Sequence, residues 1–195
     1  MDPINIFVGI TMLFAMTANY SGAKGGLKKS LTKVANRPKT YLQKVPPNIS
    51  AVILIILILG IFEIGTFEKG IIENEEICRI IGLLFFIGFS FLQVLSFKQL
   101  GNNYSQEILI LKDHQLHTSG LYSFIRHPQY LSQILADIGA AVALMSYIAL
   151  PLVLLIELPL FLLRAKEEER ILKKHFGDEF VSYKKKSGFI FPFIG

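Results

Sequence analysis

Long apolar runs alternate with short polar segments along this chain, a pattern typical of membrane-spanning helices. The first run covers residues 4–23 and has no charged residue, and the second covers 49–67 with Glu63 as its one charge. A third run covers residues 79–98. Each run approaches the ~20 residues that a helix needs to cross the hydrocarbon core. We therefore expect three spans in the first half of the chain.

A fourth apolar stretch, Tyr130 to Leu163, is longer than one span and is interrupted by prolines and acidic residues. We interpret it as a helical hairpin that turns near Ser146 to Pro151, with spans at 129–147 and 149–166. A single long span is the alternative and would give four spans. The expected fold is all-α: a polytopic membrane helical bundle of about five transmembrane helices, forming one domain over residues 1–195.

Basic residues set the expected orientation, because Lys and Arg concentrate in cytosolic loops. Asp2 precedes the first run, which excludes the usual order of a secretory signal peptide. The basic residues after this run form a loop with no acid among them, comprising Lys24, Lys28, Lys29, Lys33, Arg37, Lys39 and Lys44. The link after the second run is acidic instead, and the C-terminal segment is rich in lysine. We expect an external N-terminus, a cytosolic C-terminus, and cytosolic segments at 99–128 and 164–195.

Composition agrees with a membrane protein and argues against other classes. The chain is 52% hydrophobic and 18% charged, whereas a soluble domain has about 25% charged residues. The net charge of +5 comes from loops that flank apolar runs, so we expect no nucleic-acid partner. Cys78 is the one cysteine, so an intrachain disulfide is excluded, and we interpret it as a packing residue. His114 and His117 lack a ligand motif, and we predict no metal site.

Two polar clusters flank the expected hairpin and carry the candidate chemistry. The first covers residues 114–130 and the second covers 164–183. If the hairpin forms, both clusters end on the cytosolic face, and residues roughly 34 positions apart become neighbours. Pro128 suits the first turn of a helix, whose free amides favour an anion. Arg164 and Glu168 share one helix face.

Each cluster also has a simpler interpretation. Arg126 and His127 are also compatible with simple markers of the membrane interface, as basic residues often are. Arg164 and Glu168 are compatible with a surface ion pair on a solvated helix. Arg164 nevertheless follows an apolar segment directly, and a guanidinium at the mouth of an apolar cavity can bind a carboxylate or phosphate with two hydrogen bonds.

The two clusters together resemble a known family. The string His114-x-Leu116-x-x-x-Gly120-x-Tyr122-x-x-x-Arg126-His127-Pro128-x-Tyr130 is similar to the cofactor motif of isoprenylcysteine carboxyl methyltransferases. The string Arg164-x-x-x-Glu168-Glu169-x-x-Leu172-x-x-x-Phe176-Gly177-x-Glu179-Phe180-x-x-Tyr183, with Pro192 near the end, is similar to their C-terminal motif. Phe180 departs from the family's usual tyrosine, and the chain has no tryptophan. We expect both departures to bear on the substrate pocket.

The resemblance implies an integral membrane methyltransferase that uses S-adenosyl-L-methionine and releases S-adenosyl-L-homocysteine. Its pocket would be formed by the cytosolic loop and the C-terminal helix. The cofactor-binding positions it implies are Gln106, His114, Gln115, Leu116, His117, Tyr122, His127, Pro128, Gln129, Tyr130 and Glu168. Glu107 replaces Gln106 if the alignment shifts by one residue. Arg164 matches a substrate-side arginine, so Arg164 and Glu168 are the expected catalytic pair.

The implied reaction is methyl transfer to the C-terminal carboxylate of an isoprenylated cysteine, or of a similar amphiphile that enters from the lipid bilayer. A carboxylate is already ionised at neutral pH, so the reaction needs alignment rather than a general base. A methyltransferase for a phospholipid amine or another membrane lipid is the alternative. A non-catalytic transporter with a polar path along Glu63, Asp137 and Glu157 is a third hypothesis, and the double motif argues against it.

Overall fold

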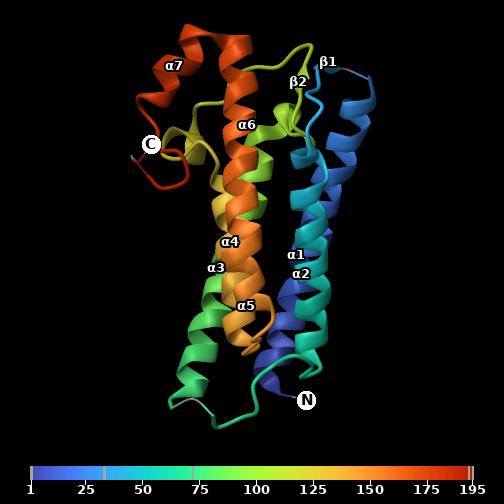
Figure 1. The fold of residues 1–195 in the computed structure, drawn as a ribbon, viewed down its shortest axis with the longest axis vertical. Helices are drawn as coiled ribbons and strands as arrows, with labels where there is room; N and C mark the ends of the chain where they lie inside the picture. Colours follow the sequence, from blue (N-terminus) through green and yellow to red (C-terminus); the bar gives the residue numbers. More distant parts are fainter. Residues whose placement is uncertain (1, 33, 72, 193, 195) are drawn as a thin grey trace.

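A bundle of long helices forms the shaft of the molecule, and short elements form a head at one end of it (Figure 1). In this computed structural model, residues 2–32, 34–71, 73–192 and 194 are described, without the side chains of 21–32 and 102. Three long helices come first: α1 (Pro3–Thr32), α2 (Val45–Ile61) and α3 (Glu75–Leu100). All three contain a stretch that is long and apolar enough to cross a membrane.

The predicted hairpin follows these three helices. α4 (Pro128–Ala143) runs back along the bundle, and the chain returns through α5 (Ala149–Leu152), a π-helical segment (Val153–Glu157) and α6 (Leu158–Phe176). The turn therefore lies before Ala149, and Pro151, which we placed in the turn, is inside the helix. Proline is tolerated there because the first amides of a helix have no intrahelical partner.

The head consists of short elements between and after the long helices. 3₁₀ turns cover Tyr41–Gln43, Gly101–Asn103 and Gly120–Ser123, and α7 (Asp178–Lys184) follows α6. Strand β1 (Val34–Asn36) pairs antiparallel with β2 (Ile110–Leu111), with Val34 opposite Leu111. The fold is thus mostly helical rather than all-α. The strands join the segment after α1 to the loop before α4, a long-range pairing that periodicity does not reveal.

Local chemistry explains where the main helices begin and end. Pro46 and Pro47 open α2, Pro128 opens α4, and Glu75 and Glu76 lie in the first turn of α3, where acids favour the positive end of the helix dipole. α6 ends at Gly177, which has a positive φ of 53° that glycine adopts without strain.

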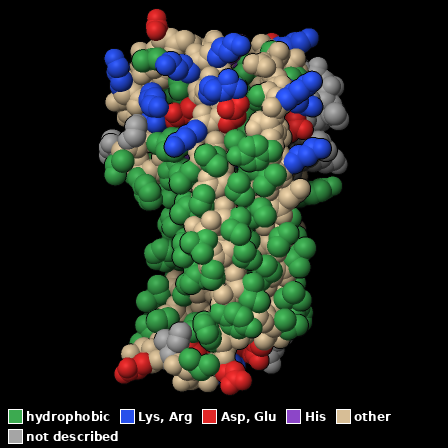
Figure 2. Space-filling view, in the orientation of Figure 1, with side chains coloured by type: hydrophobic (Ala, Val, Ile, Leu, Met, Phe, Trp, Pro, Cys, Tyr) green, Lys and Arg blue, Asp and Glu red, His purple; other side chains and the backbone are tan. Residues whose placement is uncertain are grey.

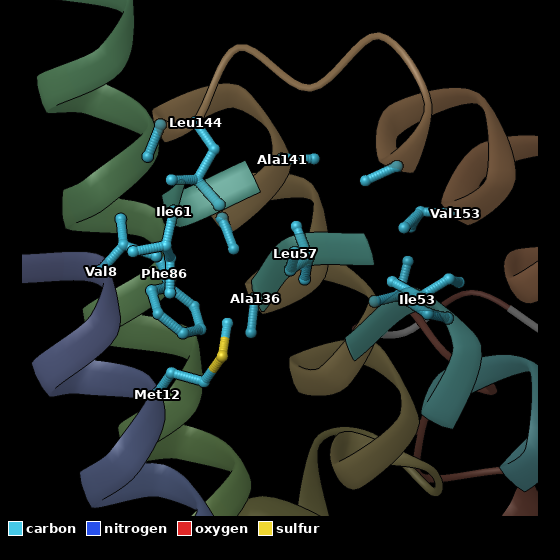
Figure 3. Packing of buried hydrophobic residues seen from close by; sticks show 14 of the residues in the cluster. Val8, Met12, Ile53, Leu57, Ile61, Phe86, Ala136, Ala141, Leu144 and Val153 are labelled. Carbon is cyan, nitrogen blue, oxygen red and sulfur yellow. The ribbon is translucent and has the colours of Figure 1, made fainter. Parts of the chain in front are cut away.

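The core lies between the helices of the shaft. Val8 and Met12 of α1 meet Leu57 of α2 and Phe86 of α3, with Ala136 of α4 close by (Figure 3). The outer surface of the shaft is also hydrophobic, whereas basic side chains gather over the head, with some acidic ones among them, and acidic ones also lie at the opposite end (Figure 2). A hydrophobic outer surface of this extent matches a lipid environment.

Three further expectations from the sequence need correction. α2 ends at Ile61, and Glu63 lies beyond it with a positive φ of 65° and an exposed side chain, so Glu63 is not inside a span. The predicted basic loop is partly helical, because α1 continues to Thr32. The side chains of Lys24, Lys28 and Lys29, and all of Lys33, lie outside the described part. Cys78 is exposed on α3 rather than packed.

Candidate active site

Two adjoining cavities lie where the shaft meets the head. The head cavity, about 130 Å³, is lined by residues of both sequence motifs and of the loop before β2. The bundle cavity, about 560 Å³, lies between α1, α2, α3, α4 and α6. Gln129 and Tyr130 of α4 and Ser105 and Glu107 of the loop line both cavities. The two spaces therefore share one wall.

The head cavity brings most of the predicted cofactor positions together. The predicted positions that line it are His114, Gln115, Leu116, His117, Tyr122, His127, Gln129, Tyr130 and Glu168. Pro128 is not among the lining residues and instead opens α4. Gln106 lines the bundle cavity, whereas its alternative, Glu107, lines both.

Tyr130 stands at the boundary between the cavities and joins the two motifs. Its hydroxyl donates a short hydrogen bond to Glu168 Oε1 and accepts one from Arg164 Nε at 2.8 Å. Glu168 lines only the head cavity, and Arg164 lines only the bundle cavity. We expected residues 34 positions apart to become neighbours, and Tyr130 and Arg164 are such a pair. The hairpin therefore brings the hydroxyl of Tyr130 on α4 to one acid and one guanidinium of α6.

Arg164 is buried, with 3% of its surface exposed. Its Nη1 donates to Leu42 O at 3.0 Å, its Nη2 donates to Gln106 O, and its Nε lies 3.5 Å from Glu168 Oε1. This is not a surface ion pair. Three of the five N–H groups of a guanidinium are engaged with described residues, and two remain for a ligand in the bundle cavity. Arg164 thus also fixes the loop that forms the cavity wall.

Besides Arg164, the 3₁₀ turn before α2 also holds this loop through hydrogen bonds. Gln43 Nε2 donates to Ile108 O at 2.7 Å, and Gln43 Oε1 accepts from Ile108 N at 2.9 Å. Both amide groups of one side chain are therefore paired with one residue of the loop. A loop held from two sides is a suitable wall for a binding site, because its geometry does not depend on a ligand.

Arg126 and Glu169 form the support behind the site. Arg126 is buried and donates to Glu169 Oε1 at 2.5 Å and to the backbone carbonyl oxygens of Lys184 and Ser187. Lys184 Nζ also contacts Glu169, at 3.0 Å. His127, also buried, lies 3.6 Å from both Glu168 and Glu169. Arg126 and His127 are therefore interior residues, not markers of the membrane interface.

Electrostatics around the head cavity favour a cationic ligand. Burial raises the pKa of Tyr122. Burial also lowers the pKa of His114, with a smaller effect from the nearby His175, and this keeps the His114 ring neutral at pH 7. Burial acts to raise the pKa of Glu169, but contacts with His127, Arg126 and Lys184 outweigh it and lower this pKa to about 2. The lining thus offers the carboxylate of Glu168, whereas Glu107 is paired with Arg37 at 2.9 Å and Arg126 is paired with Glu169.

Sequence reasoning missed several lining residues. Phe180 lines the head cavity and not the bundle cavity, so this departure from the motif lies among most of the predicted cofactor positions. Tyr183 and Leu172 also line it, and their places in the second motif were a signal for them. Asn103 and Ser105 had no such signal, because they lie in an irregular loop. Among the described residues, no group of three or more His, Cys, Asp or Glu could hold a metal ion.

Residues 80–174, which include most of this site, match the model of the isoprenylcysteine carboxyl methyltransferase (ICMT) family. Through these residues the chain is similar to this family. Both ends of the matched region lie in helices of the shaft or head, α3 and α6. The ICMT match therefore covers the boundary at which Tyr130, Arg164 and Glu168 meet.

Several protein-S-isoprenylcysteine O-methyltransferases are similar in sequence. The Saccharomyces cerevisiae enzyme is 30% identical over 121 residues, which cover 61% of this chain and 51% of that protein. The Rattus norvegicus enzyme is 34% identical over 115 residues, covering 58% and 40%. The Homo sapiens enzyme is 35% identical over 96 residues, covering 48% and 34%. The chain thus matches about half or less of the length of these curated ICMT relatives.

One solved structure has the same fold. It is described as the eukaryotic intramembrane Ras methyltransferase ICMT, and it matches with a TM-score of 0.67 and 22% identity. The match covers 100% of this chain and 69% of the other. The chain thus has the fold of an intramembrane protein, and three of its described helices are long and apolar enough to cross a membrane.

Proposed function

We propose that this chain transfers a methyl group from S-adenosyl-L-methionine to the C-terminal carboxylate of an isoprenylated cysteine, or of a similar amphiphile from the bilayer. The observation that carries the proposal is the position of Tyr130 between Glu168 on the head cavity and Arg164 on the bundle cavity. In this arrangement the head cavity, which is polar and can accept a cation, shares one wall with the bundle cavity, which lies at the level of the lipid. The family and the similar enzymes support the same activity.

The residues of the head cavity fit the proposed cofactor. Glu168 would hold the cofactor's ammonium group, and the rings of Tyr122 and His117, which pack edge to face at 5.2 Å, offer surfaces for its adenine. The first turn of α4 has no side-chain cap, so its amides suit the cofactor's carboxylate. When bound, S-adenosyl-L-methionine supplies the methyl group on a sulfonium. The product left behind is S-adenosyl-L-homocysteine.

The residues of the bundle cavity would place the acceptor. Arg164 would hold the acceptor carboxylate through its two remaining N–H groups, and Phe161 and Leu54 would contact the tail. The acceptor is ionised at neutral pH, so these residues need only exclude water and fix its direction. The Tyr130 hydroxyl bonds to both Arg164 and Glu168, whose Nε and Oε1 atoms lie 3.5 Å apart, and so links the acceptor side of the site to the cofactor side.

We further propose that residues 1–195 act as one methyltransferase domain, with α4 and the continuous α5–α6 helix as the fourth and fifth spans. The cofactor region would comprise residues 99–128 and 164–195 on the cytosolic side. Basic side chains gathered over the head support this orientation (Figure 2), since Lys and Arg accumulate on the cytosolic side of membrane proteins. No nucleic-acid partner is part of this proposal.

The test combines binding and turnover. We expect the purified protein to bind S-adenosyl-L-methionine and S-adenosyl-L-homocysteine in isothermal titration, and to methylate N-acetyl-S-farnesylcysteine. Glu168→Gln should weaken cofactor binding by roughly 10- to 100-fold, because a charge-assisted hydrogen bond is lost. Glu167→Gln is the matched control, since Glu167 pairs with Arg170 on the outside of the same helix.

Two outcomes would redirect the proposal. Absence of cofactor binding in the wild type would refute methyl transfer by this site. Cofactor binding with transfer to phosphatidylethanolamine, and none to the farnesylated acceptor, would replace the carboxylate acceptor by a lipid amine. An equal loss of binding in Glu167→Gln and Glu168→Gln would remove Glu168 from the site.

A further inference from the structure

The bundle cavity has a polar lining that a hydrocarbon tail does not require. Besides its apolar wall, it is lined by Asn19, Ser50, Gln93, Gln133 and Asp137. These side chains come from α1, α2, α3 and α4, which are long helices of the hydrophobic shaft. Polar groups in such a place are costly unless they are hydrogen-bonded.

A chain of hydrogen bonds links these residues across the bundle. Asn19 Nδ2 donates to Gln93 Oε1 at 3.4 Å, and Gln93 Nε2 donates to Gln133 Oε1 at 2.8 Å. Asp137 comes next, close to both Gln133 and Glu157, and Glu157 belongs to the π-helical segment. The amides of Asn19 and Gln93 each donate on the side that leads to Asp137 and Glu157. These two hydrogen bonds therefore run in the same direction across the bundle.

The far end of the chain lies in the interior. Glu157 is fully buried and accepts a hydrogen bond from Ser50 Oγ at 2.6 Å through Oε1. Its Oε2 has no hydrogen-bond partner among the described residues, and the same is true of Asn19 Oδ1 at the other end. Both atoms are acceptors. The polar chain therefore has hydrogen-bond capacity for donors beyond those that the described residues supply.

Structural association of helices is the simpler explanation of such a chain, because polar side chains bond across helices in membranes. Two observations go beyond it. Most members line an open cavity instead of a closed helix interface. The chain also ends in two neighbouring acids, Asp137 and Glu157, although neutral amides or hydroxyls bond across helices at lower cost.

We propose that the bundle cavity selects an acceptor whose lipid tail carries a hydrogen-bond donor, a hydroxyl or an amine, which binds at Asp137. This inference rests on the proposed function and names the substrate class of the same site. The carboxyl group to be methylated lies at Arg164, at the boundary with the head cavity. The donor group lies deeper, where Asp137 and Ser50 line the cavity and Ser50 donates to the buried Glu157.

The experiment compares three acceptors that differ only at the far end of the tail: N-acetyl-S-farnesylcysteine and its ω-hydroxy and ω-amino analogues. We expect kcat/KM to be roughly 10-fold higher for at least one donor-bearing acceptor, the gain expected for one hydrogen bond to an acid. Which of the two is preferred identifies the donor group. Asp137→Leu should reduce the preference to less than about twofold.

Two further variants distinguish the loss of the hydrogen bond at Asp137 from a loss of folding. Asp137→Asn retains an acceptor oxygen, so it should keep a preference for the hydroxyl and lose any preference for the amine. Ser90→Ala changes another residue of the same cavity that is not part of the hydrogen-bonded chain, and it should leave the ratio unchanged. Melting temperatures of all variants show whether they fold.

Failure of the inference and failure of the proposed function have different signatures. Methyl transfer to all three acceptors at equal kcat/KM, or a preference for the plain farnesyl chain, overturns the inference alone. Absence of transfer to every acceptor refutes the proposed function. The inference is then decided by binding: donor-bearing compounds must raise the melting temperature of the wild type more than the plain compound does, and equal shifts overturn it.

Discussion

Arg164 performs two tasks at once in this structure. It lines the bundle cavity, where we place the acceptor carboxylate, and it also holds the carbonyl oxygens of Leu42 and Gln106. A planar guanidinium can serve several acceptors in fixed directions, whereas an ammonium acts as a point charge. The effect of replacing Arg164 therefore has to be measured on both the methyltransferase activity and the stability of the protein.

We predict that Arg164→Lys slows kcat/KM for a farnesylcysteine acceptor by roughly 30- to 150-fold, because one charged contact of ~2–3 kcal/mol is lost. Arg164→Ala should also lower the melting temperature, since two backbone carbonyls lose their donor in the interior. Cofactor affinity, measured by titration calorimetry, should remain near that of the wild type.

Arg170→Lys serves as the control for this prediction. Arg170 is exposed on the same helix and pairs with Glu167, so an exposed ion pair worth at most about 1 kcal/mol is changed. Full methyl transfer by Arg164→Ala would contradict the assigned role. A loss of the same size in Arg170→Lys would show that the helix, not the guanidinium, is responsible.

Among the described helix contacts of the bundle that involve a glycine, the contact between α3 and α4 is the closest. A Cβ atom at Gly82 would lie 2.6 Å from Ala143 N and 2.8 Å from Gly139 O, and one at Gly139 would lie 2.6 Å from Phe86 N. Small residues at helix contacts let two backbones approach in membranes. The close approach places α4, and with it Tyr130, relative to the other spans.

We predict that Gly82→Ala destabilises the protein by about 2 kcal/mol, because the obstructing atoms are backbone and the helices must separate. Gly88→Ala on the same helix is the matched control, since a Cβ there meets nothing within 4 Å. Alanine at 88 should be neutral or stabilise by about 0.5–1 kcal/mol through helix propensity. Thermal unfolding in detergent measures both; equal effects would contradict the close contact.

At the scale of the whole molecule, Glu169 joins three parts of the head. It binds Arg126 from the loop before α4 and Lys184 from α7, and Arg126 N also bonds to Gly188 O of the C-terminal segment. This bond attaches the C-terminal segment at Gly188 to the loop before α4. The acid's low pKa makes this assembly sensitive to pH.

We predict that stability falls as the pH drops from about 4.5 towards 2. Glu169 has an ordinary pKa of 4.5 when unfolded and about 2 when folded, so its contribution is present above 4.5 and is lost through this window. The contribution is up to about 3 kcal/mol. Glu169→Gln should be less stable at pH 7, because Arg126 is left buried without its partner, and its melting temperature should depend less on pH over this window.

Glu167→Gln provides the comparison for the pH series. Its side chain also pairs with an arginine, Arg170, which lowers its pKa, but that pair lies at the surface. The variant should keep the pH profile of the wild type, since exposed pairs contribute little. A wild-type profile that is flat from pH 4.5 to 2 would contradict the assigned role of Glu169.

We also predict that the acidic and basic ends of the molecule lie on opposite sides of the membrane. With Cys78→Ser as background, a cysteine at Glu68, in the link after α2, should react with a membrane-impermeant reagent from outside. A cysteine at Lys185, after α7, should react only after permeabilisation. Both positions are exposed, so labelling from the same side would contradict five spans.

The sequence by itself determined the helical shaft, the hairpin and the place of the two motifs. Apolar runs of span length and proline helix starts act locally, so they can be read without the fold. They located α1 to α4 and α6, and the Arg164–Glu168 spacing followed from helix geometry alone. The bounds were less certain: Ile61, not Phe67, ends α2, because apolar residues continue into the turn.

Tertiary structure alone decided how these parts serve one site. The β1–β2 pairing, the burial of Arg126, and the engagement of Arg164 with Leu42 and Gln106 all join residues far apart in the chain. Such contacts depend on which elements meet, and periodicity contains no information about this. The division into two cavities at Tyr130 has the same origin, since a wall exists only when helix, loop and hairpin pack together.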